Sequence, residues 1–380
     1  MILDKPHPTY ARIDVDAFRN NLRVVRSIVG PHVKIMPVVK ANAYGHGVVA
    51  LSKIALEEGV AMLGVARSIE AFQLRTEGIQ GRLLLFEVVP QEHEERCLRE
   101  NCDLTVISLQ GANRLSASAG KLGVNARVHV KIDTGMGRLG VPFEQAVEFV
   151  SSVARLPHIS LEGIYSHFAT SEVEDQSFAL LQLGRFTQIR DGLAAIGIQP
   201  PFVHMANSGA IITFPASHFT MVRPGLMLYG FTPRRGMSGE SLLRPVLSLR
   251  SHVSFVKTVA GGTSISYGRR YFTERSTRIA TIPIGYADGF SRLLTNKGSV
   301  LIRGRRYPVA GTVCMDHIMV DIGPESDVHE GDEVVVIGRD ETEEISGWDI
   351  AELTKTIPYE VTCLITSRVP RVAVDAPQRT

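Results

Sequence analysis

The sequence predicts an α/β protein, with an N-terminal (β/α)8 barrel of the TIM type followed by a mainly antiparallel β domain. Over roughly the first 240 residues, apolar strands alternate with amphipathic helices, which is typical of parallel strands joined by helical crossovers. Beyond that point, short β-rich runs are separated by glycine and proline turns, with few helical stretches between them. We therefore expect a barrel domain at residues 1–240 and a β domain at residues 241–380.

The barrel prediction depends on eight apolar strands. They are expected at residues 33–39, 60–65, 82–86, 103–107, 126–132, 159–165, 201–205 and 219–222. The clearest helices between them are expected at residues 48–58, 68–77, 91–100, 144–156 and 172–196. A strand at residues 10–14 and a helix at residues 16–29, with Asp16 as its N-cap, are expected before the first of these units.

The second part of the chain has a different pattern. Its β-rich runs lie at residues 243–259, 277–284, 298–302, 307–313, 316–322 and 333–338. A last helix is expected near residues 347–356, and residues 231–240, which include Thr-Pro-Arg-Arg-Gly, resemble a linker.

Composition and charge exclude several classes of function. Of the 380 residues, 44% are hydrophobic and 21% charged, and 41 basic residues balance 39 acidic ones without a long basic tract. Nucleic acid and membranes are therefore not expected partners. The polar N-terminus is unlike a secretory signal, and no segment has the length of a membrane span, so we expect a cytoplasmic protein. The four cysteines form no C-x-x-C pair and no metal-binding motif is present, so we expect free thiols and no metal.

Lys40 is the first candidate for a chemical role. It ends an apolar strand and precedes a loop of glycines and small residues, Ala41 to Gly47. Partial loss of water around such a lysine favours its neutral, nucleophilic amine, which suits a Schiff base. A lysine that merely reaches into solvent from the sheet rim is the commoner explanation of such a position.

Other polar residues follow the predicted strands, at the barrel face where active sites lie. They are Tyr44, Asp133, Arg138, His167, Asn207, Ser208, Arg223 and Gly225. A phosphate requires backbone N–H groups and hydroxyl donors, and Asn207-Ser208-Gly209 together with Pro224-Gly225 offers both. A lysine near a phosphate site points to pyridoxal phosphate (PLP).

A competing motif is Gly135-Met136-Gly137-Arg138-Leu139-Gly140, which satisfies the G-x-G-x-x-G fingerprint of dinucleotide binding. Pro142 fits the first turn of the next helix, which would then begin beyond the glycines. The only acidic residue at a suitable distance, Glu162, lies inside the next strand. We interpret the motif as an active-site loop that presents Arg138, and an NAD-dependent oxidoreductase as a remote alternative.

The β domain contains tyrosines beside glycine turns, Ser266-Tyr267-Gly268 and Gly285-Tyr286-Ala287-Asp288-Gly289. Such rings most often pack at hairpins. As an acid or base, Tyr267 would need a cation or a hydrogen-bond network near its phenol.

Together these residues resemble the alanine racemase family of fold-type III PLP enzymes over nearly the whole chain. The matching motifs are Val39 to Gly47, Lys131 to Arg138, Tyr165 to Ala169, Met221 to Gly225, Ser266 to Gly268, Gly285 to Gly289 and Cys314 to Asp316. One departure is His317, where glutamine is more usual in the family.

The resemblance implies a role for each matching residue. Lys40 would hold PLP in a Schiff base and act as the base on one face of the substrate Cα. Tyr267, from the second subunit of a homodimer, would be the base on the other face. Arg223 would face the pyridine nitrogen, with His167 beside it. The phosphate would be bound by Tyr44, Ser208, the backbone of Gly225 and Leu226, and Tyr359.

The resemblance also implies which residues contact the amino-acid substrate. Arg138 would orient the substrate carboxylate or the Tyr267 phenol. Lys131 matches a lysine that is carbamylated in many members and would hold Arg138. Tyr286, Met315 and Asp316 would line the substrate pocket and its entrance, contributed by the second subunit.

The leading hypothesis is therefore a racemase for L- and D-alanine, in D-alanine supply for peptidoglycan or in its breakdown. A racemase that also accepts serine, and a decarboxylase of the same architecture, are the alternatives among enzymes. A PLP carrier built from the barrel alone is the non-enzymatic alternative, and the full β domain argues against it.

Overall fold

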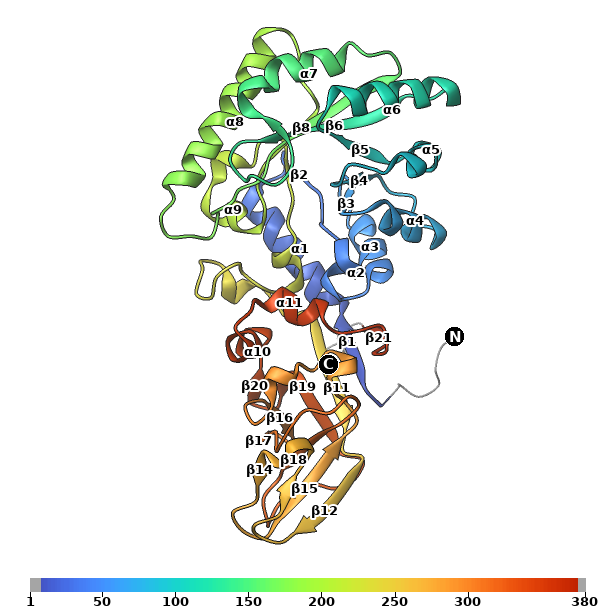
Figure 1. Cartoon of the computed structure of the whole chain (residues 1–380). Coiled ribbons are helices and arrows are strands. Elements are labelled where there is room, and N and C mark those ends of the chain that lie inside the picture. Colours follow the sequence, from blue (N-terminus) through green and yellow to red (C-terminus); the bar gives the residue numbers. More distant parts are fainter. Residues whose placement is uncertain (1–7, 375–380) are drawn as a thin grey trace. The chain divides into compact units, whose positions relative to one another are not determined.

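The computed structural model describes residues 8–374, which fold as two compact units (Figure 1). The barrel unit consists of residues 19–43 and 48–244, and the C-terminal unit of residues 8–18, 44–47 and 245–374. The first strand and the short segment Tyr44–Gly47 thus group with residues far away in the sequence. No helix in residues 8–374 is both long enough and apolar enough to cross a membrane.

The barrel unit contains all eight predicted parallel strands. They are β2 (Lys34–Ile35), β3 (Leu63–Val65), β4 (Leu83–Leu85), β5 (Asp103–Val106), β6 (Ala126–Asp133), β8 (Ile159–Tyr165), β9 (Phe202–His204) and β10 (Met221–Val222). Their order is β2-β10-β9-β8-β6-β5-β4-β3. A parallel bridge between Val38 and Gly64 joins the two ends of this order, with Val39 N–H donating to the Gly64 carbonyl over 2.8 Å. The sheet therefore closes on itself, as the fold prediction requires.

Helices cover the outside of these strands (Figure 1). They are α1 (Val15–Val29), α3 (Val48–Glu57), α4 (Ser68–Thr76), α5 (Gln91–Arg99), α6 (Leu109–Leu122), α7 (Ala146–Ala154), α8 (Ser177–Ala195) and α9 (Ser208–Thr213), with 3₁₀ turns η1 (Phe143–Gln145), η2 (Pro215–Ser217), η3 (Leu226–Tyr229) and η4 (Glu240–Leu242). The predicted Asp16 cap of α1 is wrong. Asp14, the last residue of the preceding strand, accepts the Ala17 N–H over 2.8 Å, because α1 follows that strand without a loop.

The barrel interior is only partly apolar. One layer consists of Met36, Met62, Leu84 and Met221, with Phe86 and Phe202 packed against it. Other barrel strands contribute buried polar side chains: Asp103, Thr105, His129, Lys131, His204 and, just after β10, Arg223. Buried polar groups are stable only when hydrogen-bonded, so this interior is built around specific contacts.

The C-terminal unit is mainly antiparallel, as predicted. One sheet has the order β17-β16-β19-β11-β1-β21 with β20 paired to β19, another β12-β15-β18, and β13 pairs with β14. Their bounds are β1 (Tyr10–Asp14), β11 (Leu247–His252), β12 (Phe255–Val259), β13 (Ser264–Ile265), β14 (Tyr271–Phe272), β15 (Thr277–Ile282), β16 (Ser299–Ile302), β17 (Arg305–Pro308), β18 (Ile318–Asp321), β19 (Glu333–Asp340), β20 (Glu343–Ile345) and β21 (Arg371–Val374). The helical elements are α10 (Gly347–Thr354), α11 (Pro358–Cys363), η5 (Tyr267–Arg269), η6 (Tyr286–Asp288) and η7 (Arg292–Leu294).

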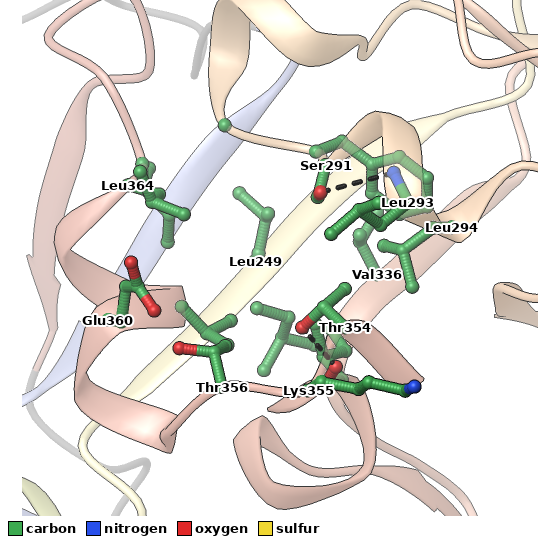
Figure 2. A pocket seen from close by; sticks show the side chains of 16 residues that line it. Leu249, Ser291, Leu293, Leu294, Val336, Thr354, Lys355, Thr356, Glu360 and Leu364 are labelled. Atoms are coloured by element: carbon green, nitrogen blue, oxygen red, sulfur yellow. Dashed lines mark hydrogen bonds between the residues drawn. The ribbon is translucent and has the colours of Figure 1, made fainter. Parts of the chain in front are cut away.

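A pocket of about 240 Å³ lies in the C-terminal unit, between η7, α10, α11 and the sheet (Figure 2). Apolar side chains such as Leu249, Leu294 and Val336 form part of its wall, and Thr354 and Glu360 add polar groups. None of the residues predicted to form the active site lines it.

Candidate active site

Lys40 lies where the first barrel strand ends and a left-handed turn begins. Val39 is fully buried and Lys40 is half-buried. The next four residues, Ala41 to Tyr44, have φ angles of 52°, 54°, 53° and 53°. A left-handed turn of L-residues costs about 1–2 kcal/mol per residue. Strain of this kind occurs mainly at functional sites, where surrounding contacts hold it in place.

Glu70 supplies those contacts in the barrel unit. Its carboxylate accepts the Ala41 N–H over 2.6 Å, the Ala66 N–H over 2.7 Å and the Arg67 N–H over 3.0 Å. It thereby ties the loop after β2 to the loop after β3. Glu70 was not among the residues selected from the sequence, where it appears as an ordinary acidic residue in the first turn of a helix.

We expect Glu70→Ala to reduce the free energy of unfolding by about 1–3 kcal/mol, because three backbone donors lose a charged acceptor. Glu77→Ala is the matched control, since Glu77 is exposed at the other end of α4. Denaturant unfolding of both variants measures the difference. Equal stability of the two variants would contradict a role for Glu70 in holding the turn.

Three further cations lie near Lys40 in the barrel unit. Burial, and then the charges of Arg138 and Arg223, lower the pKa of Lys131 to about 8, and Lys40 contributes in the same direction. Burial also lowers the pKa of Arg223 to about 10, which leaves it charged at neutral pH. Within residues 8–374, no carboxylate lies within ion-pair distance of Lys131 or Arg223. Such a concentration of buried positive charge fits an anionic ligand.

Arg223 is held in one orientation. Its Nη2 lies 2.7 Å from the Ser166 carbonyl and 2.9 Å from the Met205 carbonyl, and 3.2 Å from His167 Nδ1. Its Nη1 donates to His204 Nδ1 over 2.9 Å. An arginine has five N–H donors, so this set leaves donors for a ligand. The guanidinium is therefore a fixed group with N–H donors still available.

His167 is neutral in this environment. Burial, followed by the charges of Arg223 and Arg138, holds its pKa well below the ordinary value. Its Nδ1 then accepts from Arg223, so the ring helps to orient that arginine. The sequence placed His167 and Arg223 on the same rim, and they are in contact.

The Ser208 hydroxyl and the start of η3 lie together. The buried Ser208 hydroxyl accepts the Gly225 N–H over 3.0 Å and the Met227 N–H over 3.2 Å. Its own proton remains available for donation. Leu226 is the first residue of η3, so its N–H has no acceptor within that turn. Asn207 instead caps α9 by accepting the Ala210 N–H over 3.0 Å.

The glycine-rich loop follows β6. Asp133 accepts the N–H groups of Gly135 and Gly137, which folds the loop and leaves Arg138 exposed at its tip. The chain then forms a short strand, β7 (Val141–Pro142), which pairs with β6. No helix begins within the glycines, so the geometry of a dinucleotide fingerprint is absent from this loop. Pro142 was predicted to lie in the first turn of the next helix. It instead immediately precedes the 3₁₀ turn η1.

In the C-terminal unit, Tyr44 and Tyr359 lie together. Their ring centroids are 6.3 Å apart and the rings meet edge to face. Burial raises the pKa of the Tyr44 phenol, and Cys363 and Tyr359 raise it further. Tyr44 is therefore a protonated donor at neutral pH. Gly45 is needed beside it, because a Cβ at this position would overlap the Thr362 carbonyl.

A second group in the C-terminal unit contains Tyr267, Tyr286 and Met315. All three are exposed, Tyr267 to 73%. Tyr267 and Met315 line an open pocket of about 510 Å³ together with Asp316 and His317. The η6 turn that carries Tyr286 is bonded to the segment that carries Met315. The N–H groups of Tyr286 and Ala287 donate to the carbonyls of Cys314 and Met315, each over 3.0 Å.

Asp316 is paired with a cation. Its carboxylate accepts from Arg368 over 2.8 Å, and Arg368 also lies 3.3 Å from Asp288. The structure thus assigns Asp316 an ion pair at the pocket edge.

Both units match models of known protein domains. Residues 13–233 match the alanine racemase N-terminal domain and residues 246–373 match the alanine racemase C-terminal domain. The chain belongs to the alanine racemase family.

Individual members of the alanine racemase family agree over nearly the full length. An alanine racemase of Halothermothrix orenii is 46% identical, over 96% of each chain. One of Methanococcus maripaludis is 44% identical, over 96% of this chain and 98% of the relative. A solved structure of alanine racemase from Clostridium difficile superposes with a TM-score of 0.93 at 39% identity, and covers 97% of this chain and 96% of that one.

Sequence reasoning missed three buried residues that are linked to Arg223 by hydrogen bonds: Asp103, His129 and His204. Each is a polar residue inside an otherwise apolar strand, which is the signal that could have identified them.

Proposed function

We propose that this chain is a PLP-dependent enzyme that interconverts L-alanine and D-alanine. The observation that carries the proposal is the group at the barrel rim: the half-buried Lys40 with the buried cations Lys131 and Arg223, neither of which forms an ion pair within residues 8–374. A carbonyl-bearing, anionic cofactor and an amino-acid carboxylate would both be accommodated by these charges. Related proteins named alanine racemase support the choice of alanine.

The residues present fit PLP. Ser208 and the backbone of Gly225 and Leu226 would bind the phosphate, with Asn207 capping the helix that carries Ser208. The family resemblance assigns Tyr44 and Tyr359, whose rings lie together, to phosphate binding as well. Arg223 would donate to the pyridine nitrogen, beside His167. When bound to Lys40, PLP supplies an electron sink that makes the Cα proton of an amino acid removable.

Racemisation then requires two bases on opposite faces of Cα. Lys40 would take or return the proton on one face and Tyr267 on the other, so that each turnover removes one proton and adds one. A single side chain cannot reach both faces. We propose that Tyr267 serves the site of the second subunit in a homodimer, which accounts for a phenol that is 73% exposed in its own chain.

Arg138 would orient the substrate carboxylate, because it is the exposed cation of the rim. Tyr286 and Met315 would narrow the pocket around a methyl side chain, and the Asp316–Arg368 ion pair would lie at its edge. Pockets of this kind discriminate between side chains of different length by roughly 1–3 kcal/mol. The cytoplasmic location expected from the sequence remains a prediction.

One experiment tests the proposed activity. The purified protein is incubated with PLP and L-alanine in deuterated water, and D-alanine, Cα deuterium and CO2 are measured. We expect D-alanine and deuterium exchange without CO2. Retained chirality without exchange would exclude a racemase, and CO2 release would instead support a decarboxylase. A parallel incubation with L-serine measures the breadth of the substrate range.

We predict that Lys131 is carbamylated. At its lowered pKa the neutral amine adds CO2 and releases one proton, and the resulting anion would pair with Arg138. With 13C-labelled bicarbonate, a carbamate resonance is expected that Lys131→Gln lacks. A protein without this resonance at pH 8 would contradict the prediction.

The charge of unmodified Lys131 should also affect stability. Its pKa of about 8 lies below the ordinary 10.5, so the folded state disfavours the charged form. The destabilisation is complete below pH 8 and is relieved as pH rises toward 10.5. In bicarbonate-free buffer, the wild type should therefore gain about 3 kcal/mol relative to Lys131→Met between these pH values. Parallel denaturant curves at pH 7 and pH 10 check this.

A further inference from the structure

A continuous chain of hydrogen bonds crosses the barrel interior. Arg223 Nη1 lies 2.9 Å from His204 Nδ1, His204 Nε2 lies 3.0 Å from His129 Nδ1, and His129 Nε2 lies 3.2 Å from Asp103 Oδ2. Both histidines and Asp103 are fully buried. Asp103 is the first residue of β5, whereas Arg223 follows the end of β10, so the chain runs from one end of the parallel strands to the other.

Only one arrangement of protons satisfies all three bonds. Arginine can only donate, so His204 must accept at Nδ1 and carry its proton on Nε2. His204 Nε2–H then donates to His129 Nδ1, and His129 Nε2–H donates to the Asp103 carboxylate. Both rings are neutral in this arrangement. Burial, followed by the charge of Arg223, holds the pKa of His204 well below its ordinary value, in agreement.

The Asp103 end of the chain is itself fixed. Arg127 Nε donates to Oδ1 over 2.7 Å, and Arg82 pairs with Oδ2 and with Glu162. Burial alone would raise the pKa of Asp103, but its bonds to His129 and Arg82 lower it below the ordinary value. The carboxylate is therefore ionised, and a charged acceptor ends the chain.

Aromatic packing restricts both imidazole rings. His204 stacks on Tyr165, with centroids 4.9 Å apart and planes inclined by 4°. His129 stacks on Phe202, with centroids 5.9 Å apart and planes inclined by 17°. Neither ring can turn without disturbing the core, so the acceptor offered to Arg223 has a fixed position.

We propose that Asp103 and His129 are positioning residues for Arg223. They hold His204 as an acceptor at Nδ1, and this aligns the guanidinium with the ring nitrogen of the cofactor. The inference rests on the proposed function, since it assigns Arg223 to PLP. It concerns cofactor binding only and does not depend on which amino acid is the substrate.

The first test is 15N NMR of the imidazole nitrogens in the wild-type protein without cofactor. We expect His129 and His204 each to carry a proton on Nε2 and none on Nδ1 at pH 8. A proton on Nδ1 of either ring, or a charged ring, would overturn the proposal. This measurement needs no variant, so it stands even if a variant fails to fold.

The second test is a double-mutant cycle on the dissociation constant of PLP, measured by fluorescence titration. His129→Phe should weaken PLP binding about tenfold in the wild-type background. In an Arg223→Lys background the same change should have less than a twofold effect, because His129 acts through Arg223. Equal effects in both backgrounds, or none in the wild type, would overturn the proposal.

Ser116→Ala is the matched control for the cycle. The Ser116 hydroxyl is buried and donates to the Pro157 carbonyl over 2.6 Å, away from the chain of histidines. The Ser116→Ala substitution should lower the melting temperature of the protein without changing the dissociation constant of PLP. A wild type that binds PLP but does not racemise alanine would refute the proposed function and leave this inference intact.

Discussion

Lys40→Ala is expected to lose racemisation by about four orders of magnitude or more, because both the covalent attachment of the cofactor and one of two bases disappear. Lys40 is the lysine that follows the first barrel strand, beside buried Lys131 and Arg223. In the wild type, borohydride reduction should attach PLP irreversibly to the protein. In Lys40→Ala, reduction should leave the cofactor unattached.

Lys53→Ala is the control for this prediction. Lys53 is an exposed lysine on α3, the helix that follows the same loop. It should retain full activity and the reducible linkage, which mass spectrometry measures directly. Linkage of PLP to a different lysine in Lys40→Ala would contradict the assignment of the Schiff base to Lys40.

The strands and the rim could be predicted because they depend on local pattern. Parallel strands buried on both faces appear as apolar runs, and residues after such runs gather at one end of a barrel. Lys40, His167, Ser208 and Arg223 were found in this way. His167 and Arg223 contact each other, and the Ser208 hydroxyl contacts the residues after Arg223.

The left-handed turn after Lys40 could not be predicted. Ala41, Ala43 and Tyr44 have no preference for positive φ, and local sequence favours other conformations. The turn depends on Glu70, which comes from α4 and accepts the Ala41 N–H. Tertiary contacts of this kind are not encoded in the residues that adopt the conformation.

The hydrogen-bonded chain from Arg223 to Asp103 was missed for a different reason. Strand pairing determines where the two histidines lie. His204 is opposite Tyr165 on the neighbouring strand, and His129 is opposite Thr105. The sequence places Asp103, His129 and His204 in three separate strands, where each alone looks like a satisfied core residue. Their meeting inside the barrel is determined by the pairing order, which periodicity does not give.

Tyr267→Phe is expected to affect the two directions of the reaction unequally. Removal of the L-alanine proton should slow by about 10²–10⁴-fold, because that face loses its base. Deuterium exchange into D-alanine through Lys40 should persist, since its base and cofactor linkage remain. Single-turnover NMR of each enantiomer in deuterated water separates these steps. Loss of the D-alanine exchange alone would reverse the assignment of faces.

Whether Tyr267 acts across a dimer can be decided by mixing inactive variants. Lys40→Ala and Tyr267→Phe proteins are each expected to be nearly inactive in full turnover. If every site combines Lys40 of one subunit with Tyr267 of the other, a mixed dimer contains one complete site and one that lacks both bases. After random exchange of subunits in equal amounts, about one quarter of all sites would be complete, and activity should recover in that proportion.

The opposite arrangement gives no recovery. If Lys40 and Tyr267 of one chain served the same site, each site of a mixed dimer would lack one base. Mass spectrometry of intact dimers must show that subunits have exchanged, and each variant incubated alone is the control. Exchange without regained activity would therefore reject a shared site. Tyr267, which is 73% exposed, would then have to act together with Lys40 of its own chain.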